Sequence, residues 1–243
     1  MNVNWNVNRL RRLVLALVAV AVGLRWLMYF VAVDEKGLLT AWNWPGILLA
    51  VITAAVVVVA VMGCRSLTED ENPADLIPGW VWGCALALGI VTMLLTETTK
   101  GDSLAKIRYW LGWASVPCLL AVTLGLYLGK RPVFLLHGIV CLFFGLNLVD
   151  YYRVWSGEPQ IMDYLFQLFG CVGLLLTAYQ RTAFDVEAGS IRALRITELL
   201  AAFACLVGAA DSGQSLFYLA GGMWCLLGHH APALPEVTDH EYT

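Results

Sequence analysis

Charged residues are scarce in this chain, making up 14% of its 243 residues, whereas hydrophobic residues make up 60%. A soluble domain carries about 25% charged and about 45–50% apolar residues, so this balance excludes an ordinary soluble protein. The apolar residues come in long blocks, which also excludes a disordered chain. With a formal net charge of −3 and no basic stripe, the sequence gives no indication of nucleic-acid binding.

Motifs of known chemistry are missing as well. The sequence has no His-Glu-x-x-His, no Gly-x-Ser-x-Gly, no phosphate-binding glycine loop and no dinucleotide-binding fingerprint. Its seven cysteines are spread singly along the apolar blocks, so neither a disulfide framework nor a zinc site is predicted. We therefore expect a non-enzymatic protein without a cofactor and without a metal site.

The long apolar runs are the strongest positive signal. A helix that crosses the hydrocarbon core of a bilayer needs about 20 mainly apolar residues. The sequence predicts an all-α fold, a polytopic transmembrane helical bundle with short loops. It forms a single integral membrane domain over residues 1–243, of which 229–243 are a short polar C-terminal tail. Its eight predicted spans cover residues 13–33, 45–63, 77–95, 109–129, 133–149, 161–179, 194–210 and 215–228.

Lysine and arginine outside these spans set the expected orientation, because cytoplasmic loops carry the excess of positive residues. For eight spans, nine fall on the side of the N-terminus and five on the other. The five are Lys36, Lys100, Lys106, Arg108 and Arg153. The first run is also too long for the core of a cleaved signal peptide. We expect a protein of the plasma membrane with both termini in the cytoplasm.

Arg25 is the ionisable residue placed deepest in a predicted span. Thirteen residues at about 1.5 Å each put it roughly 20 Å from the cytoplasmic boundary near Arg12, in the outer half of the bilayer. The same arithmetic places Asn147 and Gln167 at a similar depth. Because charge in hydrocarbon is costly, such residues mark a candidate functional site.

Asp150 and Asp163 lie just above this layer, at the outer ends of two predicted spans, and we expect one of them to pair with Arg25. Asp150 is the first candidate and Asp163 the second. Three interpretations stay open at this point. The layer is a structural ion pair with amide hydrogen bonds, or a vestibule that binds a polar or anionic solute from outside, or Arg25 extends to the interface.

His137 and Glu198 form a second pair of interest. Both lie only about 5–6 Å inside the expected cytoplasmic boundary, by the same rise per residue. A carboxylate and a histidine could relay protons, but at this depth headgroup water would reach them.

Small residues four apart let membrane helices approach closely. Ala19 with Gly23 and Ala204 with Gly208 fit this pattern, as do Ala85 with Gly89 and Gly125 with Gly129. Two functions follow as hypotheses, both with the lipid bilayer as surroundings. One is a small-solute, possibly anion-binding or permeation protein around Arg25. The other is a structural or accessory subunit that meets other membrane subunits or copies of itself.

Overall fold

The computed structural model describes residues 7–31, 43–65, 83, 86–91, 103–127, 134–155, 161–186, 188–210 and 213–227. All regular secondary structure in this part of the chain is helical, which confirms the all-α fold class there. The named helices are α1 (Val7–Val31), α2 (Trp44–Arg65), α4 (Ser103–Tyr127), α5 (Phe134–Trp155), α6 (Ile161–Asp185), α7 (Ile191–Gly208) and α8 (Ser215–Leu227). Residues 86–91, inside the predicted third span, are helical too.

Two helix starts follow directly from local sequence. Asn43 precedes α2 and its Oδ1 accepts a hydrogen bond from the Gly46 amide at 2.9 Å, while Pro45 occupies the first turn, where its missing N–H is not needed. Ser190 caps α7 by accepting from the Ala193 amide at 3.4 Å. Each cap satisfies amides that have no partner inside their own helix.

Several helices are longer than the apolar runs that predicted them. Helix α4 begins at Ser103 rather than at residue 109, α6 continues to Asp185 rather than ending at 179, and α7 begins at Ile191 rather than at 194. At these ends the helices extend three to six residues beyond the predicted spans. An apolar run measures only the length suited to lipid, whereas the backbone hydrogen bonds continue through the flanking charged turns.

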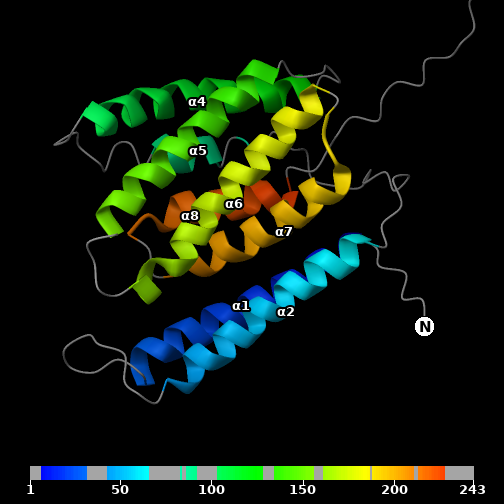
Figure 1. The fold of residues 1–243 in the computed structure, drawn as a ribbon, viewed down its shortest axis with the longest axis vertical. Coiled ribbons are helices and arrows are strands. Elements are labelled where there is room, and N and C mark those ends of the chain that lie inside the picture. The colour runs from blue at the N-terminus through cyan, green and yellow to red at the C-terminus, as the bar shows by residue number, and fades with distance from the viewer. Residues whose placement is uncertain are drawn as a thin grey trace, which may run out of the picture.

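Helix α7 lies at the centre of the arrangement. It contacts α1, α2, α6 and α8, and α5 contacts both α4 and α6. Figure 1 shows α1 and α2 side by side along one side of the bundle, joined to the other helices through α7. The hairpin of the first two helices thus belongs to the same bundle as the rest.

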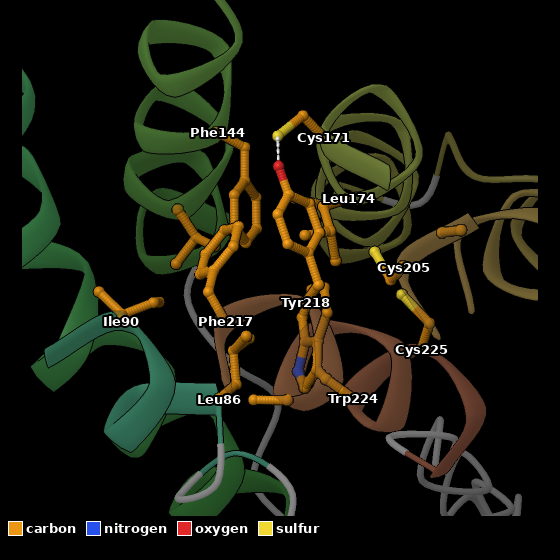
Figure 2. Packing of buried hydrophobic residues seen from close by; sticks show 14 of the residues in the cluster. Leu86, Ile90, Phe144, Cys171, Leu174, Cys205, Phe217, Tyr218, Trp224 and Cys225 are labelled. Atoms are coloured by element: carbon orange, nitrogen blue, oxygen red, sulfur yellow. Dashed lines mark hydrogen bonds between the residues drawn. The ribbon is translucent and has the colours of Figure 1, made fainter. Parts of the chain in front are cut away.

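Small residues let α6 and α7 approach each other closely. An added Cβ on Gly173 of α6 would lie 2.7 Å from the Cα of Ala201 in α7, and one on Gly208 would lie 3.2 Å from the backbone of Phe166. Around this contact, a cluster of buried rings and aliphatic chains joins α5, α6, α7 and α8, including Phe144, Leu174 and Trp224 (Figure 2). Glycine is required where two helix backbones approach this closely.

The outer surface of the bundle is strongly apolar. Large hydrophobic side chains are exposed on every named helix of the described chain. On α2 alone the exposed large side chains are Trp44, Ile47, Leu48, Val51, Val57, Val58, Val61 and Met62. Two segments, Trp44–Arg65 and Phe134–Arg153, are long and apolar enough, by length and composition, to cross a membrane. Among the described residues these two meet that criterion, so it supports two of the eight predicted spans.

Candidate functional site: two polar clusters at opposite ends

Arg108 forms the first polar cluster with residues near the end of α5. Its Nε lies 3.2 Å from Oδ2 of Asp150, and its Nη1 donates a 3.1 Å hydrogen bond to Oδ1 of Asn147. Its guanidinium also lies 5.7 Å from the centre of the Tyr151 ring. The start of α4 is thereby fixed to the end of α5 by charge-assisted contacts. We call Arg108, Asn147, Asp150 and Tyr151 the outer cluster.

Hydrogen bonds extend the outer cluster into the core. The Nδ2 of Asn147 lies 3.7 Å from the sulfur of Cys171, which lies 3.3 Å from the Tyr218 hydroxyl (Figure 2). The Tyr151 hydroxyl donates to Oε1 of Gln214, just before α8. The network therefore connects α4, α5, α6 and α8 at one end of the bundle.

Arg25 is buried at the same end of the molecule. It is 1% exposed and its guanidinium lies 5.2 Å from the centre of the Phe166 ring, near the start of α6. The next residue, Trp26, donates from its indole to the carbonyl of Ala210, after α7. Gln167, beside Phe166, is buried as well. These contacts place Arg25 where α1 meets the start of α6 and the end of α7.

The residues predicted to form one polar layer around Arg25 thus take part in separate contacts. Asn147 and Asp150 both contact Arg108, which the sequence predicts to be a loop charge on that side. The side chain of Asp163 lies outside the described residues, so pairing of Arg25 with Asp163 stays a prediction. Arg108 was missed because it precedes the apolar run, although it lies in the second turn of α4.

Glu198 organises the second cluster, at the opposite end of the helices. It is 3% exposed and accepts a 2.9 Å hydrogen bond from Nη2 of Arg181. Its other oxygen lies 3.9 Å from Nη1 of Arg195, one helical turn away. Arg181 stacks 3.8 Å from the centre of the Trp224 ring. Three helices, α6, α7 and α8, meet in these contacts.

A small pocket lies beside Glu198. Its lining includes Leu10 and Arg11 of α1, Cys64 of α2, Arg195 of α7 and Cys225 of α8. Arg11 is 8% exposed. We call Arg11, Arg181, Arg195 and Glu198 the inner cluster. His137, predicted to lie at the same depth as Glu198, is buried on α5.

Both clusters lie between packed helices, and each contains a buried charged side chain, Arg108 in the outer cluster and Glu198 in the inner cluster. Among the described residues there is no group of three or more His, Cys, Asp or Glu side chains that could hold a metal ion. The chain matches no family model, no curated protein and no solved structure. A functional assignment therefore depends on the geometry of these clusters and of the apolar surface.

Proposed function

We propose that this chain is a multi-pass membrane protein whose helices cross the bilayer as one bundle. Soluble monomers rarely expose contiguous apolar patches larger than a few hundred Å². Here large apolar side chains cover the outside of the helices, while Arg25, Asn147 and Glu198 are buried. Apolar residues outside and ionisable residues inside are the distribution expected in lipid, where charged side chains face the bundle interior.

The positions of the helix ends support the same proposal. The inner cluster and its pocket bring together the start of α1, the end of α2, the end of α6, the start of α7 and the end of α8. The contacts of Arg25 and of the outer cluster bring together the opposite ends. A chain that crosses a membrane repeatedly places alternate ends on alternate sides. With nine basic residues predicted on the side of the inner cluster, that side is the cytoplasmic one.

For its activity, we infer a non-catalytic subunit of a membrane complex. The observation that carries this inference is the closure of the polar layer: Asn147 is 0% exposed and Arg25 is 1% exposed. A permeation path or vestibule needs these residues to line water-filled space, whereas a structural role needs them enclosed. Their contacts with neighbouring helices fit the structural role.

A small-residue seam on α1 supports contact with another membrane protein. Ala19 and Gly23 are both exposed, and an added Cβ on Gly23 would meet nothing within 4 Å. Gly208, in contrast, is buried against α6 inside the bundle. Small residues four apart on an outward face let a second helix approach closely.

Binding of a small solute at Arg25 is the second candidate. It is favoured by one observation, the burial of a guanidinium in the outer half of the bundle against the ring of Phe166. A cation in that position would attract an anion once the surrounding helices moved apart.

Gentle extraction of the tagged chain, followed by native mass spectrometry, separates the two candidates. The subunit proposal predicts a stoichiometric protein partner, either another chain or a second copy, that is lost in Gly23→Leu. Val58→Phe adds bulk to an exposed position on α2 and serves as the matched control, which should keep the partner. A single chain that carries a reproducible small anion, lost in Arg25→Leu, would contradict the subunit proposal and establish solute binding.

A further inference from the structure

The two terminal nitrogens of Arg11 are buried at the inner end without a hydrogen-bond partner among the described residues. Within the part of the chain that the structure describes, no group accepts a hydrogen bond from its Nη1 or Nη2. The neighbouring Arg12, in contrast, is exposed. A buried donor without an acceptor is costly, and more so when it is charged. Arg11 therefore needs an acceptor that the described side chains do not supply.

The carboxylate that lines the same pocket, Glu198, is already engaged. One oxygen of Glu198 accepts from Arg181 at 2.9 Å, and the other lies 3.9 Å from Arg195. The inner cluster thus holds three guanidinium groups and one carboxylate among the described residues. Nη1 of Arg195 is also buried without a hydrogen bond. The local balance is positive, which selects for an anion.

The shape of the pocket narrows the choice of anion. Arg11 and Arg195 both line it, and its empty space admits a group about the size of one water molecule. One oxygen of a larger anion fits this space, with the remainder of the anion outside the opening. A phosphate group offers such an oxygen, and arginine recognises phosphate with paired N–H donors.

We propose that this pocket binds a phosphate group, with one phosphate oxygen between Arg11 and Arg195. The proposal rests on the membrane location argued above, because at the cytoplasmic end of the helices the abundant phosphates are those of lipid headgroups. Basic pockets between helices on this side are suited to anionic lipid headgroups. Free phosphate offers the same chemistry, so the experiment includes both sources.

The test uses the full chain purified in an uncharged detergent. Lipid binding is measured by native mass spectrometry, and thermal stability is measured with and without each probe. The probes are dioleoyl phosphatidic acid, dioleoyl phosphatidylcholine and inorganic phosphate. Arg11→Gln removes one of the two guanidinium groups that line the pocket. Arg12→Gln is the matched control, since it removes the adjacent exposed charge.

We expect the wild-type chain to bind phosphatidic acid about tenfold more tightly than phosphatidylcholine, as one charge-assisted contact would give. Arg11→Gln should abolish this preference, and Arg12→Gln should keep it. If inorganic phosphate stabilises the wild-type chain as strongly as phosphatidic acid, and Arg11→Gln removes that effect, soluble phosphate is the source. Equal losses in both variants, or no preference in the wild-type chain, would overturn the proposal.

Two further measurements distinguish loss of phosphate binding from loss of folding and from absence of the chain from the membrane. Without any probe, Arg11→Gln should melt at or above the wild-type temperature, because it removes a buried charge that lacks a partner. If Arg11→Gln does not fold, Arg195→Gln should likewise abolish the preference for phosphatidic acid. Retention of the chain in membranes after an alkaline carbonate wash tests the membrane location independently, so a chain that is retained but shows no phosphate preference refutes only the pocket.

Discussion

Neutralising Glu198 should destabilise the bundle more than any other single loss of charge in the described helices. The Glu198 side chain is 4% exposed and bonds to Arg181 at 2.9 Å. Arg195 lies 3.9 Å from its second oxygen. In Glu198→Gln, the buried guanidinium of Arg11 and the largely enclosed guanidinium groups of Arg181 and Arg195 would remain without a carboxylate partner in the inner cluster.

Removing one partner of a buried ion pair costs about 3–5 kcal/mol, because the remaining charge stays buried. We expect about 3 kcal/mol for Glu198→Gln, at the lower end of that range, because the amide oxygen still accepts one hydrogen bond from Arg181. The assay is reversible unfolding in mixed micelles, with the free energy of unfolding taken from the denaturant midpoint. A lower midpoint with an unchanged slope is the expected result.

Arg192→Gln is the control, because it removes an exposed charge from the same helix. It should change the free energy of unfolding by less than about 0.5 kcal/mol. A loss below about 1 kcal/mol in Glu198→Gln would refute the reasoning, since a desolvated pair cannot be that insensitive to loss of charge. Equal losses in both variants would show that net charge, not the buried contact, determines stability.

Two further predictions concern close packing and the outer cluster. Gly173→Ala should cost about 1–3 kcal/mol in the same assay, because the new methyl would lie 2.7 Å from the Cα of Ala201. Gly23→Ala, with nothing within 4 Å, should be neutral or stabilising, and a loss there equal to that of Gly173→Ala would contradict the packing. Arg108→Gln should lower the free energy of unfolding by about 1–2 kcal/mol, whereas the control Lys106→Gln, at an exposed position on the same helix, should leave it unchanged. Equal shifts of the denaturant midpoint in the two variants would show that Arg108 makes no specific contact.

The axial positions of many residues could be predicted from the sequence, because a helix rises by a fixed distance per residue. The depth argument put Arg25, Asn147 and Gln167 at one level and Glu198 near the opposite end. The structure places Arg25 near the start of α6 and Asn147 near the end of α5, with Glu198 at the other end. All-helical structure could also be predicted, because an apolar run in lipid must satisfy its backbone hydrogen bonds within the segment, as a helix does.

Lateral neighbours could not be predicted in this way. Depth says how far along a helix a residue lies, but not which helices adjoin it, so the assignment of Asp150 to Arg108 needed the packing of α4 against α5. Arg11 and Arg181 were counted as loop charges for a related reason. Both lie within helices but beyond the apolar runs, so hydrophobicity alone does not show that they are helical.

Labelling of single cysteines in intact cells tests the membrane bundle most directly. In a background without the native cysteines, Lys106→Cys and Arg12→Cys place thiols at exposed positions at opposite ends of the helices. An impermeant thiol reagent should label Lys106→Cys from outside and Arg12→Cys only after the membrane is permeabilised. Labelling of both positions from the same side, or a chain that washes off the membrane, would contradict the account.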